Sequence, residues 1–216
     1  MKKLLCLMLQ LLVLLPFVAV LLPQTMSAEE LGEDVVEFVL HKRMIRDIDY
    51  NDQFEFHEND GLAISEEAGK TADIISQTVP LNGATFAVYD MTDYYHDKKA
   101  AENMTSREFV QQIAETSRNN IRQLITEERL AQVGESVTTG KDTVGGLGDG
   151  IARIQVPKKN QDRDAVYLIF EESIDPEIGL NVDIDQTAIP IAAVLPIYHP
   201  TEPTEELQEI HIYPKN

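Results

Sequence analysis

Residues 35–44 read Val-Val-Glu-Phe-Val-Leu-His-Lys-Arg-Met, and this stretch decides the fold class. Every second residue falls on the same face of an extended chain, and that face carries Val36, Phe38, Leu40, Lys42 and Met44. Alternation of this kind predicts a β-strand with one side against a hydrophobic core. Lys42 therefore points to where the core should be.

Other parts of the chain repeat the strand pattern. Residues 165–172 are apolar on both faces, which predicts a central strand. Within that stretch, Glu171 shares a face with Tyr167 and Ile169. The remaining predicted strands are 84–89, 151–156, 187–198, whose two prolines indicate an edge position, and 210–216.

The segments between these strands differ in character. Residues 45–79 are mostly polar and acidic with weak periodicity, so we expect a long surface excursion with little regular structure. Residues 105–133 are amphipathic and begin with Thr105 and Glu108 at capping-box spacing, which predicts one inserted helix. The glycine-rich residues 140–150 lead into a strand rather than a helix, so we expect a hairpin loop and not a phosphate-binding loop.

The N-terminal residues predict export. Two lysines precede a long apolar run without charge, and a short polar stretch ending in small residues follows. We expect a secretory signal peptide at residues 1–28, with an uncleaved membrane anchor as the alternative. Residues 29–216 then form one domain, in which spaced strands and a single helix predict an all-β fold, a β-sandwich, rather than alternating βαβ units.

The charge and cysteine content restrict the partners. Two of the 18 basic residues lie in the leader and all 37 acidic residues follow it, which argues against nucleic acid and anionic lipid. Cys6, the one cysteine, also lies in the leader, so we expect neither a disulfide nor a thiolate metal site in the exported domain.

Chemical motifs are few. The chain contains neither a Gly-x-Ser-x-Gly elbow nor a His-Glu-x-x-His pair, so we expect no conventional enzyme and no cofactor. Asp47, Asp49, Asn51 and Glu58 have the spacing of a calcium loop, but Asp52 replaces its turn glycine. We therefore expect a solvated acidic loop and no metal site.

Four motifs, in this order and after a signal peptide, resemble the N-terminal module of Gram-positive sortase-assembled backbone pilins. They are Leu-His-Lys at 40–42, Pro-Leu-Asn-Gly-Ala-Thr-Phe at 80–86, Tyr-Leu-Ile-Phe-Glu at 167–171 and Tyr-Pro-Lys-Asn at 213–216. The resemblance covers nearly the whole mature chain. It implies an Ig-like, CnaB-type sandwich of the SpaA kind, displayed on the cell wall as part of a fimbrium.

The same resemblance implies a covalent polymer of neighbouring pilin subunits. In this family a class C sortase cleaves an LPxTG-type signal on one subunit, and the pilin-motif lysine of the next subunit attacks the resulting thioester. Lys215 matches that lysine. Strand alternation puts Lys215 on the face opposite Asn216, and an exposed amine on an ordered strand suits this attack.

Many modules of this family also form an internal bond between a lysine and an asparagine, with a nearby acid as catalyst. Lys42, Asn216 and Glu171 match those roles. Burial would lower the pKa of Lys42 towards the neutral nucleophile, and Glu171 would carry protons. The alternative is a buried Lys42–Glu171 ion pair without a bond.

Two further expectations concern the whole protein. No LPxTG-type sorting signal follows Asn216 in this sequence, so we expect the first module of a longer pilin or a truncated reading frame. The alternative function is a secreted or surface adhesin module that binds a host or matrix ligand without polymerising. Conjugation by the sortase separates the two functions.

Overall fold

The computed structural model describes residues 34–45, 59–64, 75, 78–175 and 187–214. The expected signal peptide and the acidic loop that was considered for calcium lie outside the described residues, and so do Lys215 and Asn216. All elements named below belong to one compact unit, Leu31–Asn216. Among the described residues, no helix is both long and apolar enough to cross a membrane.

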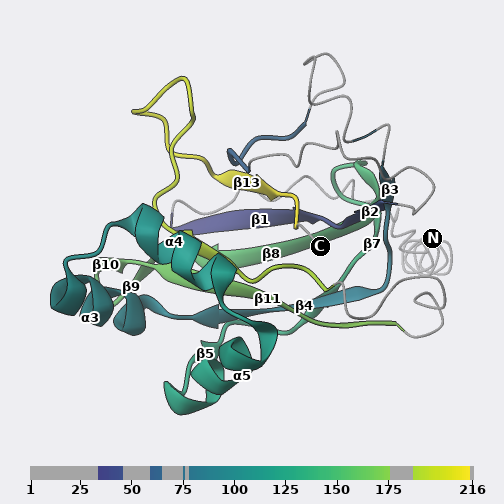
Figure 1. Cartoon of the computed structure of the whole chain (residues 1–216). Coiled ribbons are helices and arrows are strands. Elements are labelled where there is room, and N and C mark those ends of the chain that lie inside the picture. The colour runs from purple at the N-terminus through teal and green to yellow at the C-terminus, as the bar shows by residue number, and fades with distance from the viewer. Residues whose placement is uncertain (1–33, 46–58, 65–74, 76–77, 176–186, 215–216) are drawn as a thin grey trace, which may run out of the picture. The chain divides into compact units, whose positions relative to one another are not determined.

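One sheet has four strands in the order β13, β1, β8, β7 (Figure 1). β1 (Val35–His41) lies between β13 (Glu209–Ile212), which runs parallel to it, and β8 (Gly148–Pro157), which runs antiparallel. β7 (Gly140–Asp142) pairs antiparallel with β8, so the glycine-rich stretch 140–150 forms the predicted hairpin.

The predicted strand 35–44 is interrupted at Lys42. β1 ends one residue earlier, and beyond Lys42 the chain continues as β2 (Arg43–Ile45), which pairs with β3 (Thr78–Pro80) in a separate two-stranded sheet. β3 ends the predicted surface excursion 45–79, most of which lies outside the described residues.

The second large sheet has the order β12, β11, β4, β5. β11 (Val166–Ile174) lies antiparallel between β12 (Ile191–Val194) and β4 (Ala84–Asp90), which confirms the predicted central strand and the predicted edge strand. The shorter strands are β5 (Ala131–Gln132) and β6 (Val137–Thr138), both paired with β4, and the hairpin of β9 (Lys159–Asn160) and β10 (Arg163–Asp164).

The two large sheets share one core. Val36, Phe38 and Leu40 on the inner face of β1 are almost fully buried, as their alternation predicts. Phe38 meets Tyr167 of β11 edge to face, with ring centroids 6.3 Å apart. Each fully buried side chain of this size stabilises the fold by about 1.5–3 kcal/mol. The cluster also contains Phe86, Val88, Ile154, Val156, Ile169, Ile210 and Ile212.

The predicted β-rich fold is confirmed, but the expectation of a purely all-β domain with one inserted helix over 105–133 is wrong. The described chain contains three helices that follow β4: α3 (Thr92–Glu102), α4 (Ser106–Glu115) and α5 (Arg118–Glu127). Their buried side chains pack with Val166, Leu168 and Phe170, the outward face of β11, in a second hydrophobic cluster. The helices therefore cover the side of this sheet that faces away from β1 (Figure 1).

Local capping explains the division into separate helices. Thr105 and Glu108 form the predicted capping box and start α4. Thr116 then adopts an extended conformation, and the Ser117 side chain accepts the Asn120 N–H to start α5, so the helix stops and restarts. α3 was missed because its sequence, Thr-Asp-Tyr-Tyr-His-Asp-Lys-Lys-Ala-Ala-Glu, has little apolar periodicity.

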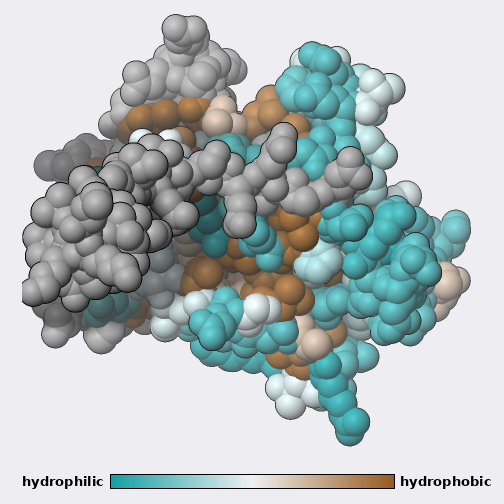
Figure 2. Space-filling model, turned by 180° about the vertical axis from the view of Figure 1, so that it is seen from behind, coloured by the Kyte–Doolittle hydropathy of each residue, from teal (hydrophilic) through white to brown (hydrophobic). Residues whose placement is uncertain are grey.

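The surface reflects the strongly acidic composition. Seen from behind, hydrophilic residues dominate the side on which α3 lies, while apolar residues gather in the middle of the face (Figure 2). Polar side chains thus cover the elements that project from the sheets, as expected for a chain with a formal net charge of −19.

Candidate functional site

Lys42 and Glu171 form an ion pair inside the core. Lys42 Nζ donates to Glu171 Oε2 at 2.7 Å, and both side chains are 0% exposed. Lys42 follows β1 in the first sheet and Glu171 lies on β11 in the second, so the pair bridges the two sheets. The structure therefore brings together Lys42 and Glu171, two of the three residues that the family resemblance matched to the internal bond.

The backbone of Lys42 is held from two sides. Its N–H donates to the Gly150 carbonyl at 2.8 Å, and its carbonyl accepts the Leu81 N–H at 2.9 Å. Gly150 has φ +78°, and a Cβ there would lie 2.6 Å from the Lys42 carbonyl oxygen and 3.0 Å from the Leu81 nitrogen. Only glycine fits this close approach. Gly150 is thus a positioning residue that the sequence analysis missed.

Asn82 links the two segments that hold Lys42. Its Oδ1 accepts the Gly150 N–H at 2.7 Å, and its Nδ2 donates to Asp149 Oδ1 at 3.1 Å. The sequence analysis noted this residue only within the 80–86 motif. Its side chain fixes the start of β8 beside the turn that follows β3, and so supports the Lys42 backbone indirectly.

Glu171 sits where the pairing of β11 with β4 is irregular. Glu171 pairs with Phe86 and Ser173 with Thr85, so one extra residue is inserted at this point. Bulges of this kind redirect side chains and are frequent beside functional sites. Glu171 Oε2 also accepts the Ala188 N–H at 3.2 Å, whereas the buried Oε1 has no hydrogen-bond partner among the described residues.

Burial controls the charge state of the lysine. Desolvation lowers the pKa of Lys42 below its usual value, and the attraction of Glu171 opposes that shift only in part. The neutral amine, which is the nucleophilic form, is therefore easier to reach than at the surface. A lysine with a lowered pKa beside a carboxylate can attack an amide while the carboxylate takes up and returns the proton.

The C-terminal strand is held on both sides. β13 pairs with β1, and residues 59–64 bind its other edge: the His211 N–H donates to the Gly61 carbonyl at 2.9 Å, and the Tyr213 N–H donates to Asn59 Oδ1 at 2.8 Å. The Tyr213 hydroxyl accepts the Ile64 N–H at 2.8 Å. His211 and Tyr213 lie on the face predicted for Lys215, yet residues 59–64 leave them only 6% and 8% exposed.

The sequence analysis did not predict the contacts of residues 59–64 with this strand. It also missed the ring of His41, which stacks on Tyr213 with centroids 4.4 Å apart. The polar segment 45–79 has no periodic pattern that would indicate pairing with a strand about 150 residues later. Lys215 and Asn216 follow Pro214 directly in the chain and lie outside the described residues.

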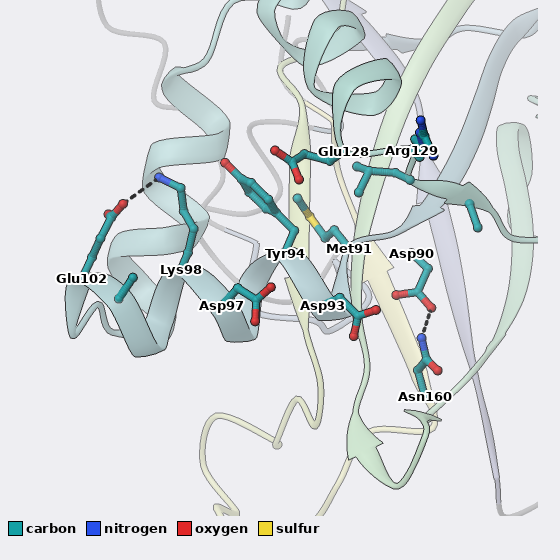
Figure 3. A pocket seen from close by; sticks show the side chains of 13 residues that line it. Asp90, Met91, Asp93, Tyr94, Asp97, Lys98, Glu102, Glu128, Arg129 and Asn160 are labelled. Carbon is teal, nitrogen blue, oxygen red and sulfur yellow. Dashed lines mark hydrogen bonds and ion pairs between the residues drawn. The ribbon is translucent and has the colours of Figure 1, made fainter.

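A cavity of about 470 Å³ lies apart from this site (Figure 3). Carboxylates dominate its wall, where Asp93, Asp97 and Glu128 appear with Tyr94 and an ion pair of Lys98 with Glu102. It shares no lining residue with the Lys42–Glu171 pair. Across the described part of the chain, no group of three or more His, Cys, Asp or Glu side chains could hold a metal ion.

The fold and the site together define a class of protein: a β-rich module with a buried lysine–glutamate pair between its sheets. The chain belongs to the family described as Gram-positive pilin subunit D1, N-terminal domain, whose profile matches residues 33–216. This is a family of structural proteins. No curated protein sequence is significantly similar to the chain.

Solved structures similar to the chain include a basal pilin and a shaft pilin. The SpaE basal pilin from Lactobacillus rhamnosus GG in its orthorhombic form is 27% identical over 85% of this chain and 52% of that chain, with a TM-score of 0.57. The trigonal form of SpaE is 26% identical over 85% of this chain and 52% of that chain, with a TM-score of 0.55. The N-terminal domain of the shaft pilin SpaA from the same organism is 18% identical over 84% of this chain and 94% of that chain, with a TM-score of 0.47. The chain spans about half the length of the SpaE chains that it matches.

Proposed function

We propose that this protein is a structural subunit of a covalently polymerised pilus on the surface of a Gram-positive cell, and that Lys215 is the amine that accepts a neighbouring subunit. The observation that carries the proposal is the buried Lys42–Glu171 pair in a chain of the pilin family. The firmly held strand that leads into Tyr-Pro-Lys-Asn supports the role of Lys215.

The intersubunit step requires a sortase with a pilin held as a thioester on its cysteine. The neutral Lys215 Nζ attacks the thioester carbon, a C–N bond forms, the C–S bond breaks, and the thiolate leaves as the amine loses a proton. An amine on an ordered strand needs less conformational restriction to meet the acyl-enzyme than one on a loose terminus. Pairing of β13 with both β1 and residues 59–64 supplies this order up to Pro214.

The internal step joins Lys42 to Asn216 within one chain. Lys42 Nζ attacks the Asn216 carboxamide carbon, Glu171 takes a proton from the amine and delivers it to the leaving nitrogen, and ammonia departs. Three observations support the assignment: the 2.7 Å contact of Lys42 with Glu171, the lowered pKa of Lys42, and the buried Oε1 of Glu171 that has no described partner.

The sheet register also favours this bond. Ile212 pairs with Leu40 in the parallel ladder of β13 with β1, and both side chains belong to the core. Two residues further along each chain bring Lys42 and Pro214 into the corresponding positions. If the alternation of β13 continues to the end of the motif, it predicts that Asn216 faces the same side as Lys42.

The test is conjugation of the purified protein to an LPxTG peptide by a class C sortase. We expect Lys215→Ala to abolish the conjugate and Lys159→Ala, an exposed lysine on β9, to leave it unchanged. Undiminished conjugation of Lys215→Ala would refute the proposed role of Lys215.

A second candidate function is a basal position in the pilus. SpaE, described as a basal pilin, shares 25–27% identity and the fold with this chain. A basal subunit would receive one pilus at Lys215 without forming polymers of itself. Expression of the whole protein with its sortase distinguishes these roles: a ladder of homopolymers indicates a shaft subunit, and a single addition to another pilin indicates the base.

A further inference from the structure

Two histidines connect the strand of Lys42 to the strand of the Tyr-Pro-Lys-Asn motif. His41 Nε2 lies 2.8 Å from His211 Nδ1, and the His41 ring stacks on Tyr213 with centroids 4.4 Å apart. On the other side of His211, its Nε2 lies 2.8 Å from Glu209 Oε1. Glu209, His211 and His41 therefore form a chain of hydrogen bonds that ends against the first residue of the motif.

The hydrogen-bond partners determine which ring nitrogen of each histidine carries the proton. Burial acts to raise the pKa of Glu209, but hydrogen bonds from Arg153 and His211 hold it below its usual value, so Glu209 is an ionised acceptor at neutral pH. His211 Nε2–H donates to it, which leaves His211 Nδ1 as the acceptor for His41 Nε2–H. The bond between the two rings therefore needs one donor nitrogen and one acceptor nitrogen.

The surroundings also disfavour charge on His41. Burial, followed by the charges of His211, Arg43 and Arg153, lowers its pKa to about 3, and Asp142 opposes the shift. The charged or titratable groups that face the pair come from every neighbouring element: Arg43 of β2, Arg153 of β8, Asp142 of β7, Glu209 and Tyr213 on the side of β13, and Asp60 of the covering segment, which acts on Tyr213.

We infer that neutral His41 is a positioning residue for the acceptor strand: its hydrogen bond to His211 and its stacking on Tyr213 hold the residues that lead into Lys215, and acid opens the strand at His211 and Tyr213 without breaking a Lys42–Asn216 bond. The inference rests on the role proposed for Lys215. Release exposes His41 to water, where it binds a proton near its ordinary pKa. The opened state is therefore favoured by up to roughly tenfold for each pH unit below about pH 6.5.

The first test needs no sortase. The amides of His211 and Tyr213 donate to Gly61 and Asn59, so their hydrogen exchange reports the opening of this strand. We would measure it from pH 7 to pH 5 in the purified protein and in His41→Phe, which keeps a ring against Tyr213 but neither donates to His211 nor titrates.

After correction for intrinsic exchange, we expect the wild-type opening constant to rise steeply with acid. In His41→Phe it should be larger at pH 7 and rise less steeply. His199→Asn, in the exposed loop before β13, is the matched control and should follow the wild type. An equally steep rise in His41→Phe overturns the inference. If His41→Phe does not fold, His41→Gln replaces it, because its amide can still donate to His211 but does not titrate. A less steep rise of its opening constant supports the inference, and an equally steep rise overturns it.

The second test links the strand to acceptor function. The protein competes with a small amine for the acylated sortase in one mixture, so that the pH dependence of the enzyme cancels. We expect conjugation of wild type relative to His41→Phe to fall from pH 7 to pH 5. If the ratio of wild-type to His41→Phe conjugation does not change with pH and Lys215→Ala is inactive, only this inference is refuted. Conjugation that survives Lys215→Ala refutes the proposed function.

Discussion

Replacing Glu171 by Gln should prevent the internal bond and leave the unreacted Lys42 amine without its carboxylate partner, while changing almost nothing in size. The carboxamide accepts a hydrogen bond from Lys42 but cannot carry a proton between the amine and the leaving nitrogen, so the Lys42–Asn216 bond should not form. Glu172→Gln is the matched control, because that neighbouring side chain points away and accepts from Tyr89 and Ser136 instead.

The size of the effect has two parts. In the variant the unreacted Lys42 amine stays buried without a carboxylate partner, which costs about 3–5 kcal/mol. The bond between Lys42 and Asn216 would close a loop of roughly 170 residues, and losing such a cross-link costs about 5 kcal/mol in the chain-entropy description. A total of about 8–10 kcal/mol corresponds to a melting temperature roughly 16–40 °C lower for a domain of this size.

Intact mass and calorimetry measure the two parts separately. We expect wild type and Glu172→Gln to lack the mass of one ammonia, and Glu171→Gln to retain it and to melt far below both. If wild type also retains the full mass, the site is an ion pair without a bond. A Glu171→Gln protein that has lost ammonia and melts with the wild type would refute the assigned role of Glu171.

Three other predictions follow from single contacts. Gly150→Ala should destabilise the protein by about 1–3 kcal/mol more than Gly134→Ala in chemical unfolding, because both glycines have positive φ but only the Cβ at 150 would meet the Lys42 carbonyl; equal losses would contradict this. Burial lowers the pKa of His41 from 6.5 to about 3, so the unfolded state binds more protons between these values and the free energy of unfolding should fall by about 2 kcal/mol between pH 7 and pH 5; His41→Phe should remove that part of the pH dependence, and an unchanged pH profile would argue against it. Thr105→Ala should cost about 1 kcal/mol in thermal unfolding by removing the capping box of α4, without changing conjugation at Lys215; a loss of conjugation would indicate a wider role for this helix.

The sequence predicted the inner faces well because charge burial is itself a strong signal. A lysine in register with Val36, Phe38 and Leu40 has to lie in the core, and a buried lysine requires a partner. Glu171, in register with Tyr167 and Ile169, was the acid with the same property. Alternation showed on which face of its strand each side chain lies, and the family resemblance supplied the expectation that the two would meet.

Contacts between distant segments could not be read in the same way. Gly150 looks like any glycine of a hairpin loop until the Lys42 carbonyl is seen against it. Asn59 lies in a segment without periodicity, and its bond to Tyr213 depends on tertiary structure alone. The prediction of one continuous helix over 105–133 failed for a local reason. The cap at Ser117 divides this stretch into two helices, although its apolar pattern is continuous.

The central claim concerns Lys215, and tandem mass spectrometry of the sortase product tests it most directly. The wild-type protein, conjugated by a class C sortase to an LPxTG donor and digested, should yield a branched peptide in which the donor threonine is joined to the Lys215 side chain. A donor found on another lysine or on the N-terminal amine, with Lys215 unmodified, would contradict the account.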